Sequence, residues 1–157
     1  MITENMKVLE FLDQSCICLD LKSATKQEAI TELCQLLYTN GKIKNSEDVL
    51  IALMEREKLG STGIGQGVAI PHGKSDSTTT LVGAFGISRK GVQFESLDGE
   101  PVYFIFMLVA PKDSSGQHLK ALARVSRLLK DKFFRQAIKE AKLPEGIEKI
   151  IHEEDEY

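Results

Sequence analysis

The sequence lacks any apolar run long enough to cross a membrane as a helix. Its longest run is the eight residues from Tyr103 to Ala110, whereas a spanning helix needs about 20; this run is typical of a buried strand. The first residues mix polar and apolar side chains, without the basic head and apolar stretch of a signal peptide. We therefore expect a cytoplasmic protein that does not insert into membranes.

Cysteine is also scarce. Cys16, Cys18 and Cys34 are odd in number and spaced for neither a disulfide framework nor a zinc site, so we expect buried thiols. A single histidine without Cys, Asp or Glu at ligand spacing is weak evidence for a metal. The net charge of −3, from 20 basic and 23 acidic residues, argues against a general nucleic-acid binder. Only three histidines, His72, His118 and His152, are available for proton or nucleophilic chemistry near neutral pH.

What the sequence does contain is an ordinary globular composition, with 42% hydrophobic and 27% charged residues. Its length fits a single domain over residues 1–157. Helical and strand periodicities alternate, which predicts the α/β class. Helices are expected over 5–12, after the capping box Thr25–Glu28, from Ser46 to about residue 58 or 59, from Ser114 or Ser115, over 133–141 and from Pro144; strands are expected over 15–21, 68–70 and 81–87, and over 92–97 and 102–109 as a hairpin. The acidic tail, 153–157, is expected to fray.

A glycine-rich loop runs from Gly60 to Gly67, with four glycines in eight residues. Such a loop can bring backbone N–H groups close to an anion. Neither common nucleotide pattern fits it, because both the P-loop and the dinucleotide fingerprint would need glycine where Val68 stands. ATP and NAD binding therefore lose their usual support.

His72 follows this loop at the exit of a short apolar segment, Val68–Ile70. Pro71 fixes the backbone before it, and Gly73 leaves room for a bulky partner. A phosphoacceptor histidine needs such a rigid, open position, with hydrogen-bond donors nearby for the phosphoryl oxygens. Ser61, Thr62 and the loop amides are candidate donors. A turn histidine with a satisfied hydrogen bond fits the same residues, and both interpretations stay open here.

The stretch from Arg56 to Lys74, REKLGSTGIGQGVAIPHGK, closely resembles the signature of the type-2 enzyme IIA domain. These domains belong to the fructose, mannitol and nitrogen class of the bacterial phosphoenolpyruvate-dependent phosphotransferase system. The segment 94–102 and the helix start at His118-Leu119 match as well, so the resemblance covers nearly the whole chain. It implies a three-layer α/β/α fold, with a mixed parallel and antiparallel sheet of about five strands and helices on both faces.

The resemblance also implies the chemistry. Family members accept a phosphoryl group on the histidine matching His72, at Nε2, from the phosphohistidine of HPr or its nitrogen-branch counterpart, and bind no cofactor or metal in this step. Arg56 and His118 match residues beside that histidine, and we expect Ser61, Thr62, Gly63 and Gly65 to support the phosphate. His152 lies in the acidic tail and is expected to have no role.

Two branches of the family remain open. Lys74 after His72-Gly73 favours a nitrogen-related regulatory IIA, whose phosphorylation state would control docking to regulatory target proteins. The segment 97–102 equally suits the IIA component of a fructose- or mannitol-type permease, which would donate phosphate to a cysteine of enzyme IIB. A domain that keeps only the fold, without phosphorylation, is disfavoured because every motif residue is present.

Overall fold

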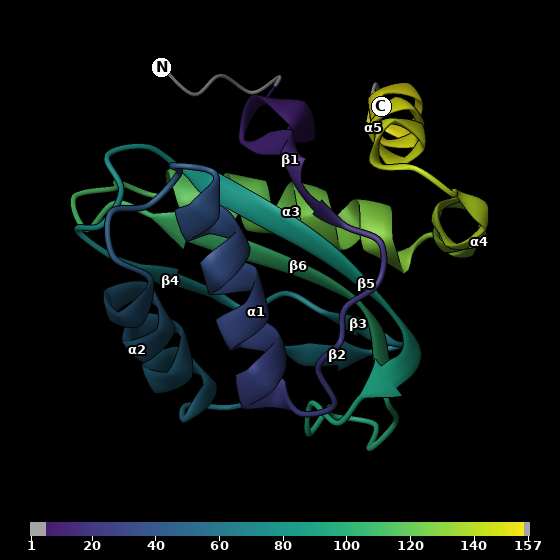
Figure 1. The fold of residues 1–157 in the computed structure, drawn as a ribbon, viewed down its shortest axis with the longest axis horizontal. Coiled ribbons are helices and arrows are strands. Elements are labelled where there is room, and N and C mark those ends of the chain that lie inside the picture. Colours follow the sequence, from purple (N-terminus) through teal and green to yellow (C-terminus); the bar gives the residue numbers. More distant parts are fainter. Residues whose placement is uncertain (1–5, 156–157) are drawn as a thin grey trace.

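A mixed sheet forms the centre of the computed structural model, which describes residues 6–155 (Figure 1). Six strands are present in this part of the chain, in the order β1-β5-β6-β3-β2, and β4 also pairs with β6. β5 and β6 are antiparallel, as are β2 and β3, whereas the pairings β1–β5, β3–β6 and β4–β6 are parallel. The strands are β1 Leu12–Cys18, β2 Gly63–Gly65, β3 Val68–Ala69, β4 His72–Lys74, β5 Val82–Val92 and β6 Val102–Ala110. The predicted mixed sheet is confirmed, with one short strand more than expected.

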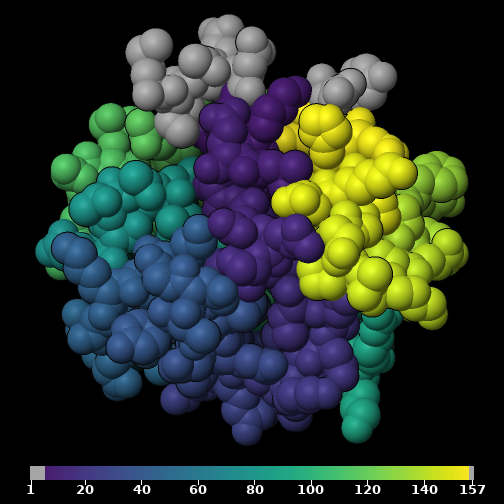
Figure 2. All heavy atoms as spheres, turned by 45° about the horizontal axis from the view of Figure 1, so that its top comes forward, coloured from purple at the N-terminus to yellow at the C-terminus, as the bar shows by residue number. Residues whose placement is uncertain are grey.

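Helices cover both faces of this sheet. α1 and α2 lie in front of it in Figure 1, and α3 lies behind β6. α4 and α5 follow α3 and bring the chain back to β1 (Figure 2), where the yellow C-terminal helix flanks the purple N-terminal segment. The helices are the 3-10 turn η1 Val8–Glu10, α1 Lys26–Thr39, α2 Ser46–Glu57, α3 Gln117–Lys130, α4 Lys132–Glu140 and α5 Pro144–Glu154. None of the helices in residues 6–155 is both long and apolar enough to cross a membrane.

Local sequence signals explain several of these boundaries. The predicted capping box begins α1: the Thr25 hydroxyl accepts a hydrogen bond from the Glu28 amide, and the Glu28 carboxylate accepts one from the Thr25 amide. Pro144 is the first residue of α5, where its missing N–H costs nothing. β6 is almost entirely buried because layers cover both of its faces.

Other boundaries differ from the prediction. Asn45, not Ser46, caps α2, because its side-chain oxygen accepts the Asp48 amide. α3 starts after Gly116, at φ +99°, rather than after a serine cap. The segment expected over 5–12 is only a 3-10 turn within its described part, and β1 begins three residues before the expected strand. In the hairpin, β5 itself reaches Val92, and residues 93–97 form a connection rather than a strand.

The expected fraying is wrong for residues 153–155. α5 continues to Glu154, and Asp155 is only 2% exposed. Its carboxylate accepts hydrogen bonds from the Arg124 side chain and the Val8 amide, both at 2.5 Å. An acidic residue near the chain end is therefore held by α3 and by the N-terminal turn. Residues 156–157 lie outside the described part.

The three cysteines are free thiols in the structure, with Cys16 and Cys34 buried and Cys18 partly buried. Burial raises the pKa of Cys34 to about 12. This thiol is therefore protonated and unreactive near neutral pH, which agrees with the expected role of buried core residues.

Candidate functional site

A shallow cavity of about 480 Å³ contains both predicted active-site histidines. Three consecutive residues of β4, from His72 to Lys74, form one wall, and His118 on α3 contributes to another. The rest of the lining comes from the last turns of α2, namely Ala52, Glu55 and Arg56, and from Leu59, two residues beyond its end. The structure thus brings together Arg56, His72 and His118, which lie far apart in the sequence. A larger groove of about 810 Å³ runs along α1, but no histidine, arginine or lysine lines it.

The topology explains this convergence. β4 lies parallel to β6, with His72 beside Leu108 and Lys74 beside Ala110, the last residue of β6. The chain leaves β6 there and enters α3, so the first turn of α3 comes close to β4. α2 packs against the same short strand. A Cβ on Gly73 would lie 3.4 Å from the Leu53 side chain and 3.5 Å from the Ala52 carbonyl oxygen. These are ordinary van der Waals distances, so β4 and α2 pack closely at Gly73.

One hydrogen bond fixes the chemistry of the His72 ring. Its Nδ1 lies 2.8 Å from the carbonyl oxygen of Ile70. A carbonyl oxygen only accepts, so Nδ1 carries the proton, and in the neutral ring Nε2 keeps a free lone pair. The hydrogen bond expected of an ordinary turn histidine is therefore present, and it leaves the second nitrogen available as a nucleophile.

His118 is the second residue of α3 and is half-buried. Its Nδ1 is buried and has no hydrogen-bond partner among the described residues. Burial lowers the pKa of His118 below the usual 6.5, and the nearby charges of Lys74 and His72 lower it further. Burial is the largest of these causes. The neutral ring can donate one hydrogen bond and accept another.

Arg56 lies in the last turn of α2. Its Nη1 donates a hydrogen bond to the carbonyl oxygen of Gly60, at 2.9 Å. This contact holds the guanidinium at the rim of the cavity while its other N–H groups stay available, since the group has five donors. Those donors suit a planar, bidentate contact with phosphoryl oxygens.

The four loop residues predicted to support a phosphate do not line this cavity. The Ser61 hydroxyl donates to the Phe94 carbonyl, and the buried Thr62 hydroxyl donates to Glu57. Gly63 and Gly65 form β2, paired with β3. The loop is therefore a small hairpin packed against the fold, and its hydroxyls have interior partners. Their predicted role in phosphate binding is not supported by these contacts.

Glycine at position 63 has a packing reason instead. A Cβ at this position would lie 2.4 Å from the Ser96 hydroxyl oxygen and 3.0 Å from the Ser96 Cα, closer than the packing allows. Gly65 has φ +99°, a conformation that favours glycine at the turn. The glycine richness that suggested an anion loop thus reflects close packing and a tight turn.

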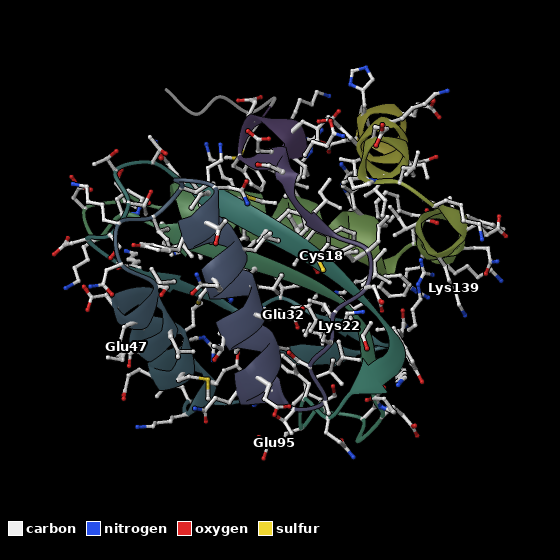
Figure 3. The ribbon with its side chains drawn as sticks, in the orientation of Figure 1. Cys18, Lys22, Glu32, Glu47, Glu95 and Lys139 are labelled. Atoms are coloured by element: carbon white, nitrogen blue, oxygen red, sulfur yellow. The ribbon has the colours of Figure 1, made fainter. Side chains whose placement is uncertain are left out.

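Two features of the site region escaped the sequence analysis. Lys74 lines the cavity, although the sequence was used only to assign it to the nitrogen-related branch. Its position two residues after His72 on a strand could have indicated that both side chains point to the same face. A buried ion pair joins Lys26 of α1 to Glu57 of α2, at 3.1 Å. Glu95, beside the start of α1 in Figure 3, adds a second carboxylate 3.3 Å from Lys26. No local pattern predicts this pairing across 31 residues.

The family model for "Phosphoenolpyruvate-dependent sugar phosphotransferase system, EIIA 2" matches residues 10–154. The chain belongs to this family. The predicted resemblance is confirmed. Residues 6–155 hold no group of three or more His, Cys, Asp or Glu side chains placed to bind a metal ion.

Relatives within the EIIA 2 family come from both branches. A fructose-specific EIIABC component of Bacillus subtilis is 39% identical over 150 residues, which cover 96% of this chain but only 24% of that protein. A nitrogen regulatory protein of Bradyrhizobium diazoefficiens is 35% identical over 147 residues, covering 93% of this chain and 95% of that protein. The crystal structure of the nitrogen regulatory protein IIA-Ntr from Neisseria meningitidis superposes with a TM-score of 0.83 at 37% identity, over 90% of this chain and 97% of that one.

Proposed function

We propose that this protein is a phosphocarrier of the phosphotransferase system that accepts a phosphoryl group on Nε2 of His72. The observation that carries the proposal is the hydrogen bond from Nδ1 to the Ile70 carbonyl, which leaves Nε2 unprotonated in a cavity shared with Arg56 and His118. Residues 1–157 would then act as one IIA unit in the cytoplasm. The family match over residues 10–154 supports the single unit.

Phosphoryl transfer from the donor exchanges one N–P bond for another and needs no cofactor. The Nε2 lone pair of His72 attacks the phosphorus of a phosphohistidine on an HPr-type donor protein. A new N–P bond forms as the donor's N–P bond breaks, and the bonding electrons return to the donor's ring. The proton stays on Nδ1, hydrogen-bonded to the Ile70 carbonyl oxygen. Arg56 and His118 offer N–H donors to the phosphoryl oxygens, which suits the charge that these oxygens carry during transfer.

Within the family we favour the nitrogen-related regulatory branch. Lys74 after His72-Gly73 favours this branch, and the nitrogen regulatory protein IIA-Ntr of Neisseria meningitidis superposes with a TM-score of 0.83 at 37% identity. In this branch, the phosphoryl charge of about −2 on His72 would control docking to regulatory proteins.

A sugar-permease role is the second candidate, because the fructose-specific relative has the higher identity, 39% against 35%. In that role the acceptor would be a cysteine thiolate of an enzyme IIB, which attacks the phosphorus and returns the bonding electrons to Nε2 of His72.

The test of the phosphocarrier function uses the intact chain with phosphoenolpyruvate, enzyme I and an HPr-type carrier. The wild type should gain about 80 Da, one phosphoryl group that is labile in acid and stable in base. His72→Gln should gain nothing, and His152→Gln, altered on the exposed side of α5, should be labelled like the wild type. Labelling of His72→Gln, or an unlabelled wild type, would refute the proposal.

The branch is tested by offering the labelled protein a purified fructose- or mannitol-type IIB. Transfer to its cysteine, lost in a Cys→Ser variant of that IIB, would support the permease role. Stable retention of the label, together with a partner set that differs between labelled and unlabelled protein, supports the regulatory role.

A further inference from the structure

Lys74 shares a strand and a cavity with the proposed phosphoacceptor. His72 and Lys74 are the first and last residues of the three-residue strand β4. Side chains two residues apart on a strand point to the same face, with Cα atoms about 6–7 Å apart. Both residues line the 480 Å³ cavity, and the Lys74 side chain is exposed. An ammonium group on a long flexible stem therefore reaches the space in front of the imidazole.

Within residues 6–155, no carboxylate pairs with the charge of Lys74. Its Nζ donates to the carbonyl oxygen of Ser114, at 3.3 Å, and it belongs to none of the ion pairs within residues 6–155. Two acidic residues near Lys74 have other partners: Glu55, which lines the same cavity, is paired with Lys58, and Asp76, two residues along the chain, is paired with Lys112. A neutral carbonyl is a weaker acceptor for an ammonium than a phosphoryl oxygen is.

We infer that Lys74 is a second phosphoryl-binding cation, which contacts the phosphoryl oxygens on His72 together with Arg56 on α2. The inference rests on the proposed function and extends it. The group on His72 carries about two negative charges, and two cations from different elements offset them. Lysine suits this position because its three N–H donors can keep the Ser114 carbonyl while also binding a phosphoryl oxygen.

The electrostatics of the neighbouring ring agree with this placement. The positive charge of Lys74 contributes to the lowered pKa of His118, so its field reaches across the cavity. The other charged or titratable groups that line the cavity are His72 on β4, together with Glu55 and Arg56 on α2. Lys74 therefore stabilises the phosphorylated form relative to the free form and makes this protein hold the group longer.

The experiment compares the wild type with Lys74→Gln, Lys74→Arg and the control Lys149→Gln. The control removes the same charge from the exposed side of α5. Each full-length protein is phosphorylated with phosphoramidate, which needs no donor protein. The pKa of the phosphoryl group is then measured by phosphorus NMR, and the equilibrium of phosphoryl exchange with the HPr-type carrier is measured separately.

Lys74→Gln should raise the pKa of the phosphoryl group and shift the exchange equilibrium about two- to fivefold toward the donor, as expected for loss of an exposed ion pair. Lys74→Arg should restore both values, and Lys149→Gln should match the wild type. Because the titration reports on folded, phosphorylated protein, a merely structural role of Lys74 would not change it. Equal values in Lys74→Gln and Lys149→Gln would overturn the inference while leaving the phosphocarrier function intact. A wild type that phosphoramidate and the carrier both fail to label on His72 would instead overturn the proposed function, and this inference with it.

Discussion

The Nδ1 atom of His72 lies 2.8 Å from the carbonyl oxygen of Ile70, so the backbone two residues earlier selects one form of the ring. We predict that the neutral ring is protonated at Nδ1, the reverse of the tautomer that a free imidazole side chain favours. Nitrogen-15 NMR of the histidine-labelled protein distinguishes the two forms by their ring-nitrogen shifts. The prediction fails if His72, identified by its absence in His72→Gln, shows protonated Nε2.

His118 should be neutral over most of the physiological pH range. Burial and the charges of Lys74 and His72 lower its folded-state pKa below 6.5. The folded protein therefore binds fewer protons than the unfolded chain near this pH, and this residue makes the free energy of unfolding fall as the pH drops from about 7 through the folded-state pKa. Carbon-detected NMR titration should place the midpoint of His118 below that of histidine in an unstructured peptide. Lys74→Gln should raise this midpoint, because it removes a nearby positive charge. An unchanged midpoint would show that Lys74 does not contribute to the lowered pKa.

Glu57→Gln should destabilise the fold by about 3 kcal/mol, because it leaves the buried ammonium of Lys26 without its closest carboxylate. The side chains of Lys26 and Glu57 are only 10% and 2% exposed. The matched control is Glu55→Gln, two residues earlier on α2, whose ion pair with Lys58 is largely solvated. That variant should lose at most about 1 kcal/mol. Urea unfolding followed by circular dichroism measures the free energy of unfolding of both variants. Equal losses would show that the buried ion pair stabilises the fold no more than the solvated one.

Asp155→Ala should likewise cost about 3 kcal/mol, because the Arg124 guanidinium and the Val8 amide both lose their buried carboxylate partner. Glu154→Ala, one residue earlier and exposed, is the control and should change the free energy of unfolding by less than about 0.5 kcal/mol. Thermal unfolding of both variants decides the matter. An unfolding temperature for Asp155→Ala equal to that of the control would show that the contacts of Asp155 do not stabilise the fold.

Features with a local cause were predictable from the sequence. The capping box of Thr25 and Glu28 and the proline that starts α5 depend on residues within one turn of each other. The meeting of Arg56, His72 and His118 was predictable only through the family signature, because these residues lie on elements that come together through strand pairing. Asn45 and Ser46 are adjacent residues of equally good capping type, so the sequence could not decide between them.

Features that depend on distant partners were missed. The hydroxyls of Ser61 and Thr62 could have faced a phosphate or the interior, and Phe94 and Glu57 determine that they face the interior. The tail was interpreted from its acidic composition alone. Whether residue 155 is ordered depends instead on its contact with Arg124, which lies 31 residues away on α3.

The contacts of Asp155 also determine when the fold can be completed during synthesis. The hydrogen bond between Asp155 and the Val8 amide spans 147 residues, so it closes almost the whole described chain into a loop. It cannot form until residue 155 has left the ribosome. α3, which carries both His118 and Arg124, therefore leaves the ribosome before Asp155, and the link through Asp155 between α3 and the N-terminal turn is completed only afterwards.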